Sequence, residues 1–275
     1  MTGIDEQFEE IITHELPTHK FKTSYDWLRI DSRENPIGEK VCHEIYPSIS
    51  SYYEESLGLL RSTRKLFKTT NAEIKSFAEK YKKIGNELQK WKEECKDEED
   101  YYAYEIATSR YLDRQTLYYW DKDIEINAFS SGMVVQLLSL FESTLHSICR
   151  NLMENDKNLP DIKQICRRDK GSVKYLKYID KSLNPSVQNA LIVTPKFEKL
   201  CSWIAIRNNI VHNNNEFKEE LIDIIEKHQL PVSRLRNKFL FNEDTIRELA
   251  DICGITMDII IEEKLRFYCM NLGKE

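Results

Sequence analysis

The chain has 275 residues, which is long enough for one large domain or two modest ones with a sizeable core. Glycine (8) and proline (7) are scarce while charged residues reach 31%, which favours long helices joined by short loops over a glycine-punctuated sheet protein. The net charge of -6 excludes a protein that coats nucleic acid with its whole surface, so any such contact must come from a local basic patch.

The cysteines and the N-terminal residues indicate where in the cell the protein is expected to be located. The seven cysteines are scattered and form no C-x-x-C pair, which argues against a zinc ribbon and a disulfide framework. The N-terminal sequence MTGIDEQFEEII lacks the charged-then-apolar order of a signal peptide, and we find no run of about 18 apolar residues. We therefore expect a soluble, cytoplasmic protein with reduced cysteines and no membrane contact.

Residues 1–122 predict a helical region of their own. A short helix (Asp5–His14) and a loop come first, followed by helical spacing over about 39–66 and a highly charged helix over about 68–96. The charged helix carries a stripe with alternating spacings of three and four, which is typical of a narrow packing seam: Ile74, Phe77, Tyr81, Ile84, Leu88 and Trp91. The next helix, over about 101–120, is rich in tyrosine, which we interpret as packing rather than base stacking.

A change of composition then marks a second region, residues 123–275. The segment 124–155 is apolar around much of a helix circumference, as expected for the central helix of a bundle. Glu142 lies within this buried helix, and a buried carboxylate needs a positively charged partner. Arg207, further along the chain, needs a negatively charged partner, so the two are candidates to pair. His146 and Cys149 supply only two visible metal ligands, so we expect no metal site.

The stretch 160–182 is locally basic in an otherwise acidic protein. We derive two interpretations, a patch that follows a phosphate backbone or a solvated helix face. The RNA-binding candidates on the first interpretation are Lys163, Arg167, Arg168, Lys170, Lys174 and Lys177.

The next helix breaks the local rules. Thr194 and Pro195 predict its start, and the asparagine run 213–215 predicts its C-cap and turn. Its apolar stripe is expected to comprise Leu200, Trp203, Ile204 and Val211, with Arg207 in the middle of it. A guanidinium keeps its charge when buried, so it needs a carboxylate, a phosphate or an interface.

The C-terminal part predicts three more helices, over 216–228, 242–253 and 257–270, with Gly254 ending the second. No segment convincingly predicts a paired strand, and Ile259–Ile261 is the best candidate. The residues around Gly254 resemble a helix-turn-helix, but the second helix would be acidic and apolar. We therefore expect it to close the bundle rather than bind DNA.

The sequence W-x-x-x-R-N-x-I-V-H, which contains Arg207, Asn208 and His212, resembles the HEPN superfamily (higher eukaryote and prokaryote nucleotide-binding domains). The resemblance covers roughly Ile124–His228 and leaves residues 1–122 unexplained. It implies an all-α fold, a HEPN-like up-and-down helical bundle, here with an additional N-terminal helical region.

The resemblance also implies a dimer whose two motif helices form a composite cleft. Many members are metal-independent endoribonucleases, often toxins or antiviral defence proteins that work beside an antitoxin or a neighbouring defence protein, and others are non-catalytic binding modules. Toxins paired with a nucleotidyltransferase antitoxin carry tyrosine two residues after the histidine, where this chain has Asn214. In those toxins the antitoxin modifies this tyrosine. Because the tyrosine is absent here, we do not expect the protein to be silenced by such a modification.

The residue chemistry agrees with RNA cleavage without a cofactor or metal. His212 can act as general acid or base near neutral pH, and Arg207 can stabilise the charged phosphate. Asn208 can orient the imidazole or hold a phosphate oxygen, and Glu142 is a supporting partner of Arg207. Our leading hypothesis is a dimeric endoribonuclease. The alternatives are a non-catalytic scaffold, in which Arg207 and Glu142 form a buried ion pair, and a DNA-binding regulator.

Overall fold

We describe the fold from a computed structural model. It describes residues 45–157, 159, 161–165, 168–183, 191–216, 218–235 and 237–271. The expected short helix at Asp5–His14 and the RNA-binding candidate Arg167 lie outside these residues. Within them the chain is built from seven helices and one β-hairpin, which confirms the all-α class.

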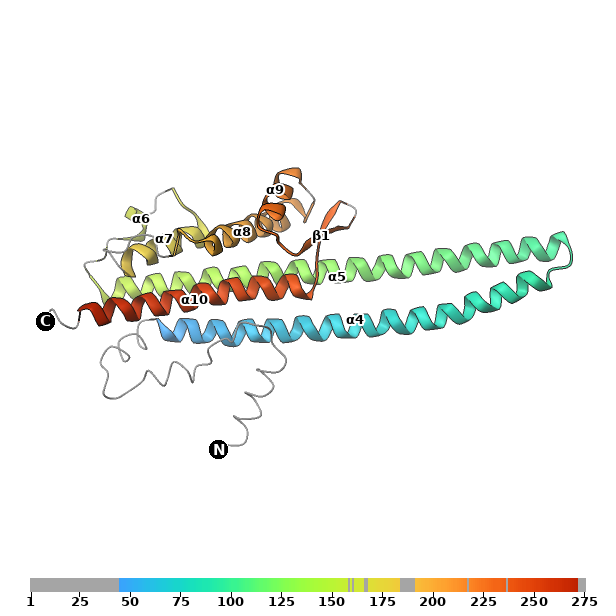
Figure 1. Ribbon diagram of the computed structural model, residues 1–275, viewed down its shortest axis with the longest axis horizontal. Coiled ribbons are helices and arrows are strands. Elements are labelled where there is room, and N and C mark those ends of the chain that lie inside the picture. The colour runs from blue at the N-terminus through green and yellow to red at the C-terminus, as the bar shows by residue number, and fades with distance from the viewer. Residues whose placement is uncertain are drawn as a thin grey trace, which may run out of the picture.

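Two long antiparallel helices run through the whole molecule (Figure 1). Helix α4 spans Tyr46–Glu94 and begins with Pro47 in its first turn, and helix α5 spans Glu98–Asn155. The turn between them is fixed by Asp97, whose carboxylate accepts a hydrogen bond of 2.8 Å from the Asp100 backbone N–H.

Each long helix replaces two shorter helices that the sequence predicted. The expected breaks near residues 67 and 121–123 do not exist, because neither place holds a glycine or proline that would end a helix. The charges at 121–123 are accommodated on the surface instead. Lys122 bridges Glu73 at 2.6 Å and Glu125 at 2.7 Å. The predicted domain boundary at residue 122 therefore falls inside α5.

The two helices have different surroundings along their length. After Thr70 no residue of α4 is buried, and before Ser130 no residue of α5 is buried. We call residues 71–129 the arm and the remaining described residues the body. Figure 1 shows the arm extending well beyond the other helices.

In the arm the predicted aromatic seam is confirmed as packing. The Phe77 ring stacks on Tyr118 with centroids 3.6 Å apart, and Tyr81 stacks on Tyr111 at 5.2 Å. The Tyr111 hydroxyl also donates to the Tyr81 carbonyl at 3.1 Å. These contacts hold α4 and α5 together where the sequence supplies few aliphatic core residues.

The body surrounds the C-terminal half of α5. Helices α7 (Gly171–Leu183), α8 (Pro195–Asn213) and α10 (Glu243–Asn271) contact it, as does the start of α4. The short helices α6 (Ile162–Ile165) and α9 (Glu219–Lys227) lie at the periphery (Figure 1). The largest fully buried side chains include Tyr52, Phe141, Tyr178, Trp203, Phe239 and Phe241. Burying each such ring stabilises the fold by about 2–3 kcal/mol.

A β-hairpin between α9 and α10 was not predicted from the sequence. Strands β1 (Val232–Leu235) and β2 (Lys238–Phe241) pair antiparallel, with Val232 opposite Phe241. Phe239 and Phe241 alternate into the core at 1% and 0% exposure. The best strand candidate in the sequence, Ile259–Ile261, lies within α10 instead. Four-residue strands are too short for period-two alternation to stand out.

Helix α10 also corrects the helix-turn-helix interpretation. It runs without a turn through Gly254, which is buried inside the body. The Tyr53 hydroxyl of α4 approaches the Gly254 carbonyl at 3.4 Å and donates to Asp258 at 2.5 Å. Tertiary packing outweighs the weak helix propensity of glycine here. The predicted break between two helices at Gly254 is therefore wrong, and no separate recognition helix follows it.

By length and composition, α5 is the one helix among the described residues that could cross a bilayer. The core helix of a water-soluble protein meets the same criteria, and the buried residues of α5 lie in the body, against α7, α8 and α10. The helix is therefore compatible with a soluble protein.

Candidate functional site

Helix α8 carries the sequence motif, and both of its predicted ends are confirmed. The Phe197 backbone N–H donates to Thr194 Oγ1 at 3.1 Å, and Pro195 occupies the first turn. At the other end Asn214 adopts a left-handed conformation with φ of 51°, and Asn215 follows with φ of 59°. Asparagine tolerates this backbone region better than most residues, which explains the asparagine run.

The buried face of α8 differs from the expected one. Leu200, Trp203 and Ile206 are fully buried, whereas Val211 is 47% exposed. The apolar stripe therefore advances by three residues at each step instead of reaching Val211. Arg207 lies at the edge of the stripe and is half-buried, so it does not stand in the core.

The motif side chains lie on the outer surface of the body. Asn208 and His212 are exposed. Arg207 Nη1 donates to Asn208 Oδ1 at 3.2 Å, so the amide contacts the arginine rather than the imidazole that the sequence suggests as its partner. Arg207 makes no ion pair with a carboxylate within the described residues. A planar donor group thus remains available to an anion from outside.

The expected pairing of Glu142 with Arg207 does not form in the single chain. The Glu142 carboxylate lies instead at the first turn of α7, 3.4 Å from the position that a Cβ on Gly171 would take. A carboxylate is favourable at a helix N-terminus, which explains how Glu142 is tolerated. Burial, and secondly the Glu142 charge, raise the pKa of Tyr175.

The basic candidates lie on α6, on α7 and in the segment between them. Lys163, Arg168 and Lys170 are exposed, and Lys174 is half-buried. Lys177 is occupied by an ion pair of 2.7 Å with Asp169. It also lies near Cys201 of α8, where burial raises the pKa of the thiol and the lysine charge opposes this rise.

His146 and Cys149 do not belong to a metal site in the described structure. The His146 ring packs beside Tyr175 with centroids 5.3 Å apart, and the Cys149 thiol donates to the Tyr175 carbonyl at 3.7 Å. No group of three or more His, Cys, Asp or Glu residues that could hold a metal occurs in the described ranges.

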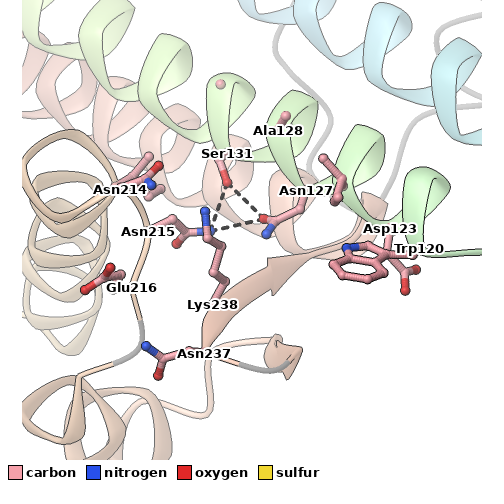
Figure 2. Close-up of a pocket in the computed structure, with 13 residues that line it drawn as sticks. Trp120, Asp123, Asn127, Ala128, Ser131, Asn214, Asn215, Glu216, Asn237 and Lys238 are labelled. Atoms are coloured by element: carbon pink, nitrogen blue, oxygen red, sulfur yellow. Dashed lines mark hydrogen bonds between the residues drawn. The ribbon is translucent and has the colours of Figure 1, made fainter. Parts of the chain in front are cut away.

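A cleft of about 640 Å³ beside the end of α8 was not predicted from the sequence. It lies between α5, the residues that follow α8 and the β-hairpin (Figure 2). Its lining combines aromatic, aliphatic and amide side chains: Trp120, Asp123, Ile124, Asn127, Ala128, Ser131, Gly132, Ile210, Asn214, Asn215, Glu216, Asn237 and Lys238. The asparagine run was a signal for this site, although its residues were assigned only to the helix cap.

Asn215 ties the three walls of the cleft together. Its Nδ2 lies 3.1 Å from Asn127 Oδ1, 3.1 Å from Ser131 Oγ and 2.8 Å from the Phe239 carbonyl. Ser131 in turn donates to Asn127 at 3.2 Å, and Figure 2 shows the hydrogen bonds that join Asn127, Ser131 and Asn215. The end of the motif helix is therefore held rigidly against both α5 and the hairpin.

Comparison with known proteins gives no relative. No family model, no curated protein and no solved structure matches this chain.

Proposed function

We propose that the protein is a metal-independent endoribonuclease of the HEPN type, active as a dimer and serving as a toxin or an antiphage-defence effector. The observation that carries the proposal is the placement of Arg207, Asn208 and His212. All three lie at the surface of one rigid helix, and none is consumed by the core. An arginine that makes no ion pair among the described residues, on the same helix as an exposed histidine, fits the binding of a phosphate from a partner molecule.

Each residue has a role in cleavage by the 2′-hydroxyl. His212 moves the proton, either from the 2′-oxygen or to the leaving 5′-oxygen. Arg207 stabilises the negative charge that builds up on the phosphorane, and Asn208 holds the guanidinium through their hydrogen bond of 3.2 Å.

The helix geometry supports a composite site. Arg207 and His212 are five residues apart, which places them about 140° apart around the helix axis. One helix therefore does not direct both side chains at one phosphate. A second copy facing the first brings the arginine of one protomer to the histidine of the other.

A different observation favours the second candidate, a non-catalytic binding module. The arm exposes large apolar side chains, with Leu117 at 54% and Ile124 at 56%. Exposed apolar groups at helical spacing are typical of surfaces that bind a partner. In this case the motif helix contributes only to an interface.

The test is cleavage of total cellular RNA in EDTA by the wild type and by Arg207→Ala, Asn208→Ala and His212→Ala. We expect at least about a hundredfold loss in the arginine and histidine variants, and a smaller loss for Asn208→Ala. His146→Ala and Arg150→Ala are matched controls, because they remove an exposed histidine and an exposed arginine from α5. Failure of the wild type to cut any RNA would contradict the enzyme and favour the binding module.

Mixing variants tests the dimer directly. A co-expressed pair of Arg207→Ala and His212→Ala chains should regain part of the activity, because one of each intact residue then faces the other. Light scattering should give twice the mass of the chain. A strict monomer that still cleaves RNA would refute the composite site.

A further inference from the structure

The cleft beside α8 has no role in the cleavage chemistry proposed above, although it adjoins the motif. Ile210 and Asn214 line it, and they continue the helix face that begins at Arg207, with steps of three and four residues. Arg207 thus stands one helical turn away from the cleft on the same face. The volume of about 640 Å³ is within the usual range for small-molecule sites.

The apolar part of the lining suits a flat ligand. Trp120 lines the cleft and is 42% exposed, so part of its indole is accessible from solvent. Ile124, Ala128 and Gly132 also line the cleft from α5. An indole beside small and aliphatic side chains is typical of sites where an aromatic ring stacks.

The polar part of the lining is made of amides, which offer donors and acceptors side by side. Asn127, Asn214 and Asn237 come from three different segments and converge on the cleft. Asn215 is 5% exposed, and its Oδ1 has no hydrogen-bond partner among the described residues. Amide groups match the mixed donor and acceptor edge of a nucleobase.

The charges decide which part of a nucleotide fits. Asp123 and Glu216 contribute two negative charges to the lining, against one positive charge from Lys238. A phosphate at the centre of this cleft is therefore disfavoured, whereas ribose hydroxyls can donate to the carboxylates. The phosphate belongs at the rim, on the side of Lys238 or of Arg207.

We propose that this cleft binds one unpaired nucleobase with its ribose, stacked on Trp120 and recognised by Asn127, Asn214 and Asn237. The base can come from a single-stranded RNA or from a free nucleotide. If it comes from RNA, the inference rests on the proposed function, and the cleft is the subsite that selects an unstacked base next to the cleaved phosphate. Base pairing would hide the edge that the amides contact, so duplex RNA is excluded.

The experiment measures binding by the full-length His212→Ala chain in EDTA, so that RNA is not consumed. The probes are the four nucleoside monophosphates, single-stranded homo-oligoribonucleotides of each base, and a duplex. Trp120→Ala should weaken binding about ten- to a hundredfold through loss of stacking. Trp91→Ala is the matched control, because Trp91 is 37% exposed on the arm and does not line the cleft.

A second variant separates recognition from folding. Asn214→Gly removes the amide but keeps the left-handed cap, which glycine adopts at no steric cost. It should weaken binding of the preferred base more than that of the others. Monophosphates bound with the same dependence on Trp120 would identify a free nucleotide as the source, and binding of oligonucleotides alone would identify RNA.

The outcomes distinguish this inference from the proposed function. Equal effects of Trp120→Ala and Trp91→Ala would overturn the nucleobase cleft even if the wild type cleaves RNA. A change of oligomeric state without a change in affinity would also overturn it and would make the cleft a protein interface. Trp120-dependent binding in a protein that cuts no RNA would support the cleft while the endoribonuclease fails.

Discussion

The arm and the body are built from the same two helices but are stabilised differently. In the body, α4 and α5 bury whole side chains such as Tyr52 and Phe141, because α7, α8 and α10 cover them. Over most of the arm, the same helices meet only each other, through half-buried rings such as Phe77 and Tyr118. Only where the arm borders the body does α5 also contact other segments, as in the hydrogen bond between Asn127 and Asn215. Regular helix therefore persists in both regions, while close packing is confined to one.

This difference in packing suggests different roles for the two regions: the body can hold a functional site in place, whereas the arm extends the molecule. The motif lies on α8 in the body, and the cleft lies at the boundary between body and arm, where the end of α8 and the hairpin meet α5. A site needs side chains held in place by packed neighbours, which the body supplies and the arm supplies only where it borders the body. The arm extends about 36 Å beyond Thr70, at 1.5 Å per residue over the 24 positions from 71 to 94 of α4.

The largest expected effect is that of removing a ring from the body core. Phe141→Ala should lower the free energy of unfolding by about 3–5 kcal/mol, because Phe141 is fully buried against Tyr52. Phe77→Ala removes the same ring from the arm and should cost about 1–2 kcal/mol, because its surroundings are partly solvent. Urea unfolding followed by circular dichroism measures both. Equal costs would mean that the arm is packed as tightly as the body.

The polar junction at the end of α8 should come next. Asn215→Ala should cost about 2–4 kcal/mol, because it removes the donor to Asn127, Ser131 and the Phe239 carbonyl and forces alanine to a φ of 59°. Asn215→Gly removes the strain and should recover about 1–2 kcal/mol of the cost of Asn215→Ala. The counterpart in the arm is Asp97→Ala, which loses one capping bond at the turn between α4 and α5 and should cost about 1 kcal/mol. Urea midpoints that are the same for the alanine and glycine variants would show that the left-handed backbone carries no cost.

Sequence patterns predicted features that depend on neighbours along one helix. The seam from Ile74 to Trp91 and the cap at Thr194 follow from spacing and residue type. The structure places both as expected, except that Trp91 at the end of the seam is 37% exposed. The continuity of α4, α5 and α10 was not predicted. Charge runs and Gly254 resemble helix ends until contacts with another helix stabilise them.

The candidate site was predicted only in part, for a related reason. Arg207, Asn208 and His212 were identified because they interrupt an apolar helix, and their exposure was not visible in the sequence. The cleft joins Asn127, Asn215 and Lys238, which are far apart along the chain, so no local pattern points to it. The hairpin that forms one wall has strands of four residues each, too few to establish a period.

Alkaline pH should destabilise the body specifically. Burial raises the pKa of the Cys253 thiol from 9.0 to about 12 and also raises the pKa values of Tyr52 and Tyr53. The folded state keeps these protons while the unfolded chain loses them. The stabilisation is therefore complete below about pH 9 and is lost as the pH rises towards 12.

The unfolding free energy should fall by about 1 kcal/mol per pH unit for each such group in this window. Cys253→Ala should remove one proton from the slope, as measured by urea unfolding at pH values from about 8 to 10.5. Cys95→Ala is the comparison in the arm, where desolvation and then the charges of Asp100 and Asp97 also raise the pKa of the thiol, but less than for Cys253, so its loss should change the slope less. An unchanged slope for Cys253→Ala would show that its thiol is accessible to solvent.

The smallest expected effects distinguish two glycines of α4, one in each region. A Cβ on Gly58 would meet nothing within 4 Å, so Gly58→Ala in the body should raise the free energy of unfolding by about 1 kcal/mol through helix propensity alone. A Cβ on Gly85 in the arm would lie 3.0 Å from the Tyr111 hydroxyl, which is held in place by its bond to the Tyr81 carbonyl. Gly85→Ala should therefore gain little, because the ring must shift and that bond lengthens.

Combining it with Tyr111→Phe removes the hydroxyl and should restore the full gain over Tyr111→Phe alone, as a double-mutant cycle measures. If Gly85→Ala alone stabilises as much as Gly58→Ala, the arm yields to an added methyl group as freely as open solvent, and its aromatic seam does not fix the distance between α4 and α5.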